Sequence, residues 1–260
     1  MTAITFYISN TKNELIKLKR TFAFWLAVIS GIMIPLLFFI VYLVKYEKLI
    51  PAEGVSPWNK FMLDQIRNSI PFLVPMFIVL ITSLIIQVEH KATGIKHLFA
   101  LPIPKWSVYY SKLFVVLSSI IASYIYFFIA ILIFGSLLGV LRPELNFLEF
   151  QPEYFKYIKM LSLSFVASLG IVGLQFWLSF RFKNFIVPLA VGMIMVIIGL
   201  IASRAPEAIY FPYAYNILSI SQGSNGPQTF GVSTVLVYSV VFFLITSVAG
   251  YLDIRRLNVK

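Results

Sequence analysis

The sequence predicts an all-helical protein that crosses a membrane several times, and three observations support this prediction. Of its 260 residues, 60% are hydrophobic and only 12% are charged, whereas a soluble domain carries about 25% charged residues. An aromatic content of 17% also excludes a disordered chain, which lacks such apolar surface. Finally, six uncharged runs each reach the roughly 20 residues that a helix needs to cross the hydrocarbon layer.

One membrane span is expected in each uncharged run, within a single domain of residues 1–260. The first run continues through Pro35 without a small-residue cleavage site, so it is a permanent helix rather than a cleaved signal. The last run begins at Ala208 and is interrupted by Pro212 and by the turn-rich string QGSNGPQ, which leaves room for one span after the break. The predicted spans are residues 21–44, 68–88, 113–141, 160–180, 184–203 and 231–252.

The segment 208–221 is too short to cross the membrane, and we expect it to be interfacial or re-entrant. Its amphipathic aromatic rings suit the headgroup layer. These rings belong to Tyr210, Phe211, Tyr213 and Tyr215.

The basic residues predict the orientation. With six spans the termini share one side, and the segments on that side hold 13 of the 21 Lys and Arg residues in 55 residues. The opposite segments hold the other 8 in 68 residues. Because positive loops stay inside, both termini are expected in the cytoplasm and the protein in the cytoplasmic membrane. The net charge of +11 is therefore an orientation signal and does not indicate nucleic acid.

The predicted spans contain no Asp, Glu, Lys, Arg or His. Ion-coupled carriers, proton pumps and intramembrane enzymes need such groups within the membrane. The sequence therefore argues against these three classes. The absence of cysteine also removes thiolate metal sites, and no metal site is expected. Gln175, beside Gly170 and Gly173, either lines a translocation path or makes an interhelical contact at small residues, and the packing interpretation is favoured.

A basic, partly apolar segment precedes the first span. Thr11 and Glu14 have the spacing of a capping box, which predicts a helix beginning there. Such a segment lies in the membrane surface with its cations toward lipid phosphates, although an ordinary positive flank fits equally well. The residues concerned, in the range 11–20, are Glu14, Leu15, Lys17, Lys19 and Arg20.

The predicted cytoplasmic loop from Glu89 to Lys112 is 24 residues long, far longer than a turn requires. Ala92, Ile95, Leu98 and Phe99 have the spacing of one helical face, and two prolines, at 102 and 104, end that helix. A short amphipathic helix of this kind suits a groove on another protein. The alternative is a helix lying on the bilayer.

At these residues the sequence resembles a known family. The order of elements is a basic helix followed by two spans around an external loop. Two motifs follow, ExxxxG at Glu89 and Gly94 and LxxLPIP at residues 98–104. This arrangement resembles the type-2 permease subunits of ABC exporters. The short lantibiotic-immunity and drug-export permeases are the most similar. The resemblance implies that residues 11–20 form an elbow helix and that the loop between spans two and three holds a coupling helix.

In that family the coupling helix docks on a nucleotide-binding subunit. The resemblance implies that Glu89 faces a basic or polar group or caps a helix end, that Gly94 permits close approach, and that the side chains at 98 and 99 fill a groove. Pro104 and Lys105 depart from the Ser-Arg pair of many relatives. The implied contact residues are Glu89, Gly94, Ile95, Leu98, Phe99, Leu101 and Pro102.

The sequence and the resemblance together predict the permease subunit of an ATP-driven exporter for a drug, an antimicrobial peptide or a lipid-linked compound. The chain has no GxxxxGK[ST] loop, so it is not expected to be an enzyme or to bind a cofactor, and ATP and Mg are expected on a partner. Expected partners are a cytoplasmic ABC ATPase, a second permease subunit, identical or different, and the bilayer. The alternative class is a non-transporting scaffold or assembly protein.

Overall fold

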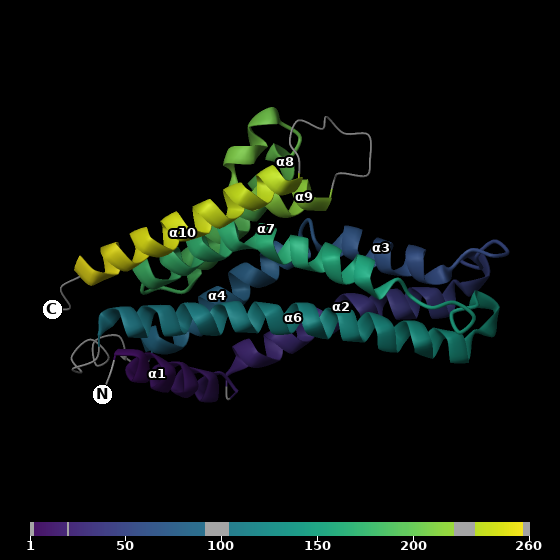
Figure 1. The fold of residues 1–260 in the computed structure, drawn as a ribbon, viewed down its shortest axis with the longest axis horizontal. Coiled ribbons are helices and arrows are strands. Elements are labelled where there is room, and N and C mark those ends of the chain that lie inside the picture. Colours follow the sequence, from purple (N-terminus) through teal and green to yellow (C-terminus); the bar gives the residue numbers. More distant parts are fainter. Residues whose placement is uncertain (1–2, 20, 92–103, 221–231, 257–260) are drawn as a thin grey trace.

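The computed structural model describes residues 3–19, 21–91, 104–220 and 232–256. Within these ranges the chain forms α-helices and 3-10 turns and no β-strand. The longest helices lie roughly along the longest axis of the molecule (Figure 1). The α-helices are α1 (Ala3–Leu18), α2 (Phe22–Val44), α3 (Pro57–Ser69), α4 (Leu73–Lys91), α6 (Lys105–Leu141), α7 (Tyr154–Arg181), α8 (Ile186–Ala202), α9 (Tyr215–Ile220) and α10 (Val232–Arg256). The 3-10 turns are η1 (Tyr46–Lys48), η2 (Pro143–Leu145), η3 (Pro206–Tyr210) and η4 (Pro212–Ala214).

Among the residues that the structure describes, four helices are long and apolar enough to cross a membrane: α2, α6, α7 and α10. Helices α3 and α4 pass the same test only as a pair that is bent by 54°. Helix α8 is apolar but has 17 residues. Each predicted span overlaps at least one helix of the structure, and residues 68–88 overlap both the end of α3 and α4. This confirms an all-helical multi-pass membrane domain, with four or five helices of spanning length in the described residues. The count of six stays a prediction.

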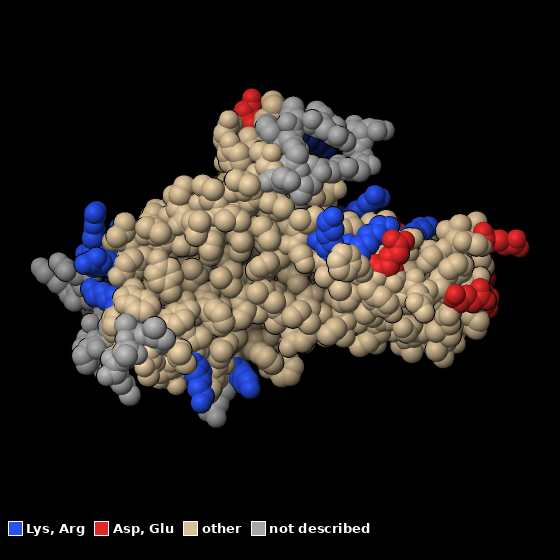
Figure 2. Space-filling model, in the orientation of Figure 1, with Lys and Arg blue, Asp and Glu red and all other residues tan. Residues whose placement is uncertain are grey.

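The charged side chains of the described residues agree with membrane insertion. In Figure 2 Lys and Arg lie at the left end and along the lower left edge, and charged residues of both signs lie from right of the middle to the right end, with an acidic group on the upper projection. A broad uncharged surface separates the left and right groups. The start of α6, helix α1 and the end of α10 lie at one end of the molecule (Figure 1). That end is the one for which the sequence predicts the cytoplasm.

The helices extend beyond the uncharged runs. Helix α6 begins at Lys105 rather than at residue 113 and has 37 residues, about 55 Å at 1.5 Å per residue. Helix α7 begins at Tyr154 rather than at residue 160. Charge sets the part of a helix that lies in lipid, but backbone hydrogen bonding decides where the helix ends, and these two limits differ.

Helix α3 lies in what the sequence predicts as a plain external loop. It ends at Ser69, and Pro71, which lacks an amide hydrogen, stands between it and α4. The buried face of α3 includes Trp58 and Phe61, and the Trp58 ring packs edge-on against Phe147 at 5.1 Å between centroids. The Trp58 Nε1 donates to the carbonyl oxygens of Phe147 and Phe150 at 2.9 and 3.0 Å. These contacts build an apolar cluster at the end opposite α1.

The capping box predicted at Thr11 is wrong. Helix α1 begins at Ala3, so Thr11 lies in its interior, where the Thr11 Oγ1 donates to the carbonyl oxygen of Tyr7 at 2.8 Å. The Thr-x-x-Glu spacing is equally compatible with a continuing helix, in which threonine bonds back to the preceding turn. The Glu14 carboxylate is consequently available for a different partner.

The aromatic rings of the segment expected to be interfacial or re-entrant, 208–221, differ in exposure, and its position in the membrane stays a prediction. Residues 206–220 form η3, η4 and α9, and Tyr210 is 70% exposed. The side chains of Tyr213 and Tyr215 are instead 1% exposed, because η4 and α9 fold back against α7 and α8. These two rings therefore pack against other helices of the chain and are not exposed to the headgroup layer.

Candidate functional site

The structure describes the two ends of the predicted partner-contact segment. Glu89 lies in the last turn of α4, which ends at Lys91, and the described chain resumes at Pro104, directly before α6. Because the intervening residues connect the end of α4 to the start of α6, a partner that binds them and moves them would pull or push on these two helix ends. The other predicted contact residues, Gly94, Ile95, Leu98, Phe99, Leu101 and Pro102, lie outside the described residues.

Helix α1 is bonded to the first turns of α6, and we call this contact the α1–α6 junction. The Lys112 Nζ lies 2.6 Å from the Glu14 Oε2, and the two side chains are 1% and 12% exposed. The Asn10 Nδ2 donates to the Ser107 Oγ at 2.9 Å. Charge-assisted bonds of this length are about twice as strong as neutral ones. The junction therefore ties α1 to the helix that begins directly after the predicted partner-contact segment.

The residues predicted for the elbow helix divide between two environments. Glu14 points into the α1–α6 junction, while Leu15, Lys17 and Lys19 are exposed. Lys17 also pairs with the Glu14 Oε1 at 3.0 Å, but its side chain is 49% exposed. Arg20 lies outside the described residues. The carboxylate thus bridges one buried and one exposed ammonium group.

An aromatic cluster joins the same turns of α6 to α7 and α10. The Tyr109 ring is 2% exposed and lies 5.0 Å from Phe176, 5.5 Å from Phe180 and 5.8 Å from Tyr251, measured between centroids. Aromatic pairs at these separations contribute about 0.5–1.5 kcal/mol each beyond their burial. The start of α6 is therefore packed against the cytoplasmic ends predicted for both α7 and α10.

Polar contacts extend this cluster at the ends of α7 and α10. The Trp177 Nε1 donates to the Asp253 Oδ2 at 3.1 Å, and the Arg181 Nε lies 3.6 Å from the same oxygen. Arg181 is half exposed, so this pair contributes little stability on its own. These contacts of Asp253 nevertheless show that the last turns of α7 and α10 lie against each other.

Gln175 is fully buried among four elements of this chain. Its Nε2 donates to the Ser83 Oγ on α4 at 3.0 Å and to the carbonyl oxygen of Pro188 on α8 at 2.9 Å. The hydroxyl of Tyr213 on η4 donates to the Gln175 Oε1 at 3.1 Å. Both ends of the amide are satisfied within the helix bundle, which favours the packing interpretation over a lining of a path.

The two glycines near Gln175 also lie at close helix contacts. A Cβ atom added to Gly173 would be 3.2 Å from the Phe243 Cα on α10, and one added to Gly170 would be 3.2 Å from the Tyr215 ring. Small residues of this kind let helix backbones approach each other. Both positions therefore serve the packing of α7.

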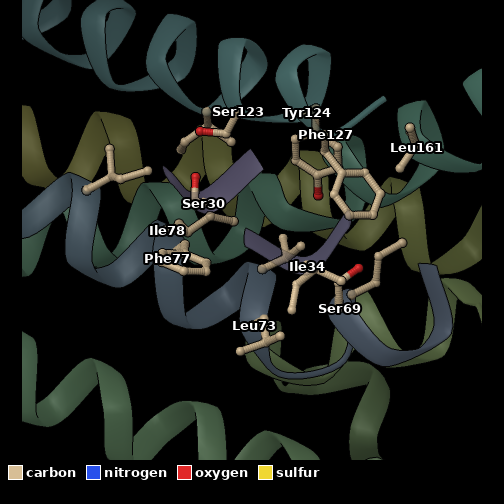
Figure 3. A pocket seen from close by; sticks show the side chains of 14 residues that line it. Ser30, Ile34, Ser69, Leu73, Phe77, Ile78, Ser123, Tyr124, Phe127 and Leu161 are labelled. Carbon is tan, nitrogen blue, oxygen red and sulfur yellow. The ribbon is translucent and has the colours of Figure 1, made fainter. Parts of the chain in front are cut away.

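A small cavity of about 40 Å³ lies between α2, α4 and α6 near the bend that follows α3. Figure 3 shows side chains from these helices around it, with the hydroxyls of Ser30, Ser69 and Ser123 at its wall. Each of these hydroxyls donates to a carbonyl oxygen of the preceding helical turn. The cavity therefore presents a mostly apolar surface, with Phe127 and Leu161 among its lining residues.

Sequence reasoning missed the main contacts of this region. Lys112 is the last charged residue before an uncharged run, and only this position hints that it lies at the membrane boundary. Nothing in the sequence links it to Glu14, which is 98 residues away. Tyr109 and Asp253 carry no local pattern that separates them from other residues near span ends.

Comparison with known proteins assigns the family. A family described as "ABC-2 family transporter protein" matches residues 11–199, from within α1 to within α8. No curated protein matches the chain significantly. The match covers well over half of the sequence. It includes the Glu14–Lys112 pair, the bent pair α3–α4, and Gln175 with its partners Ser83 and Pro188. The chain therefore belongs to the ABC-2 family of transporter proteins and is a multi-pass ABC-type permease, a membrane component of transport that normally works with an ATPase partner.

Proposed function

We propose that this chain is the permease subunit of an ATP-driven exporter in the cytoplasmic membrane, with six spans and both termini in the cytoplasm. ATP and Mg are bound by a separate cytoplasmic ATPase subunit, and a second permease subunit completes the pathway. The substrate is lipophilic or amphipathic, since the six proposed spans contain no charged residue. A drug, an antimicrobial peptide or a lipid-linked compound has this chemistry.

One observation carries the proposal: the first turns of α6 are attached to three other helices directly after the proposed coupling segment. Lys112 bonds to α1 through Glu14, and Tyr109 packs on α7 and α10. A force applied to residues 89–102 by an ATPase would act on the ends of α4 and α6. Because packed helices move as units, the junction and the aromatic cluster would pass that movement to α1, α7 and α10.

The proposal predicts that replacing both Leu98 and Phe99 by Asp abolishes recovery of the ATPase subunit with the purified permease. The substitutions place two charges where an apolar groove of the partner is proposed to bind, and desolvating them is costly. Affinity purification of the tagged permease from cells that also express its partner ATPase measures this recovery, and an export assay measures ATP-dependent transport.

The matched control is Val55→Asp with Leu148→Asp. These side chains are 53% and 66% exposed and lie in segments proposed to be external, so both ATPase recovery and export should stay unchanged. If the Leu98/Phe99 variant recovers the ATPase and exports normally, the proposed docking role is wrong. A scaffold protein, the alternative function, would recover other partners and support no ATP-dependent export.

The proposed topology predicts that cysteines introduced at Lys48 and Lys105 are labelled from opposite sides of the membrane. Lys48 lies in η1 after α2, and Lys105 begins α6. The natural chain has no cysteine, so a single introduced thiol reports its own position. Labelling of intact cells with a membrane-impermeant maleimide should modify position 48 and leave position 105 unmodified until the cells are opened. Labelling of both positions in intact cells contradicts the six-span arrangement.

A further inference from the structure

A second hollow lies on the outside of the helix bundle, between α6 and α7. It is a groove of about 480 Å³, within the range of about 300–1,000 Å³ that is typical of small-ligand sites. Its walls are apolar, with Ile121, Ile125 and Phe128 on α6 and Ile158 and Val166 on α7. Ile121 and Ile125 are 42% and 51% exposed, so the groove opens to the surface of the bundle.

The charges on α7 place this groove in the membrane. Lys159 and Arg181 are separated by 22 residues, about 33 Å along a helix, which is close to the hydrocarbon thickness of about 30 Å. Both side chains are exposed, so they mark the two boundaries of the bilayer. The α7 residues that line the groove, 158–166, start at the Lys159 boundary and extend inward. The groove therefore faces the acyl chains of the leaflet at that end.

The helical spacing places a basic residue at one edge of the face of α7 that lines the groove. Lys159, Ser162 and Val166 share one face of α7 by their i, i+3 and i+7 spacing, and the last two line the groove. Lys156, the neighbouring cation, already lies 3.2 Å from the Glu153 carboxylate. An apolar groove with an exposed ammonium group at the headgroup level is complementary to an amphiphile with a negative headgroup.

The floor of the groove is held in place by hydrogen bonds. The Tyr124 hydroxyl lies 2.9 Å from the Ser164 Oγ and 3.2 Å from the Ser168 Oγ, and the Ser168 Oγ donates to the Asn216 Oδ1 at 3.0 Å. Tyr124 and Leu161 line both this groove and the inner cavity shown in Figure 3. Their side chains thus separate a surface site from the interior of the bundle.

We propose that the groove between α6 and α7 binds an anionic phospholipid, with one acyl chain along the apolar walls and the phosphate at Lys159. The ligand comes from the surrounding leaflet, and the site does not depend on the ATPase contact. It is distinct from the α1–α6 junction, which lies at the other end of α7.

The test uses the full-length chain in mild detergent with phosphatidylglycerol or phosphatidylcholine added, and native mass spectrometry of the lipids that remain bound. The wild-type protein should retain phosphatidylglycerol in preference to phosphatidylcholine. Lys159→Gln should weaken phosphatidylglycerol binding about fivefold, the effect of about one lysine at an anionic surface, and leave phosphatidylcholine binding unchanged. Val166→Trp, which fills the groove, should remove the retained lipid of either type.

The first matched control is Lys183→Gln, which changes an exposed lysine at the opposite boundary. The second is Ile133→Trp, which introduces the same ring at a residue of α6 that is 57% exposed and does not line the groove. Both should bind lipid as the wild type does. Lys159→Gln changes an exposed side chain, so it gives a result even if Val166→Trp fails to fold. Equal retention of the two lipids, or wild-type binding by Lys159→Gln, overturns the proposal. So does a cross-link between two copies through a cysteine placed at Ile125, because a second permease would then occupy the groove.

Discussion

Replacing Lys112 by Met should strongly lower the thermal stability of the purified permease. The Lys112 ammonium group is buried and lies 2.6 Å from the Glu14 carboxylate, so the substitution leaves a mostly buried carboxylate without this partner. Removing one member of a buried ion pair costs about 3–5 kcal/mol. The measurement is the temperature at which the monodisperse peak is lost in size-exclusion chromatography after heating.

Lys17→Met is the matched control, because Lys17 pairs with the same carboxylate from an exposed position. An exposed pair of this kind contributes about 0–1 kcal/mol, so the midpoint should change little. In the double variant Glu14→Gln with Lys112→Met both charges are gone, and part of the lost stability should return. Equal losses for the Lys17 and Lys112 variants would contradict a buried ion pair at the α1–α6 junction.

Replacing Gly31 by Ala should separate α2 from α6 and destabilise the bundle. A Cβ atom at position 31 would lie 2.7 Å from the carbonyl oxygen of Ser123 and 2.9 Å from the amide nitrogen of Phe127. Both neighbours are backbone atoms of α6, so a side-chain rotation cannot relieve the overlap. Overpacking costs about 1–3 kcal/mol, and contacts with fixed backbone atoms favour the upper part of that range. The expected cost therefore outweighs the gain of about 1 kcal/mol from the higher helix propensity of Ala. The same thermal assay measures the net loss.

Ile29→Phe provides the comparison for this variant. Ile29 is on the same helix and is 45% exposed, so the larger ring extends into lipid and the midpoint should stay near that of the wild type. Gly31 also adjoins Ser30, which lines the inner cavity. If Gly31→Ala is as stable as the wild type, the close contact between α2 and α6 is incorrect.

The sequence located the spanning helices well because each is a long apolar run. It missed α3, whose exposed Lys60 and Arg67 break the hydropathy signal. That helix is amphipathic, and its apolar face is covered by Phe147 and its neighbours. A charge-based test finds segments that face lipid, but it passes over a helix that buries only one side against protein.

Short sequence patterns predicted the helix start and the burial of single side chains less accurately than composition predicted the spans. The Thr11 and Glu14 spacing predicts a helix start, yet the preceding residues continue the helix to Ala3, since a cap signal acts only where the chain would otherwise leave the helix. The rings of Tyr213 and Tyr215 have a composition typical of the interface, but the fold buries them. The burial of a single side chain depends on neighbours that are distant in the sequence.

Composition alone predicts that this protein inserts into a membrane as a bundle of helices. Insertion depends on the summed transfer free energy of the side chains from water into lipid. With 60% hydrophobic and 12% charged residues, that sum favours the membrane however the helices pack. The pairing of the polar groups, in contrast, depends on how the helices pack. Glu14 finds Lys112 across 98 residues, and Gln175 reaches Ser83 across 92, because hydrogen bonds and ion pairs require a specific geometry that exists only after the helices have packed.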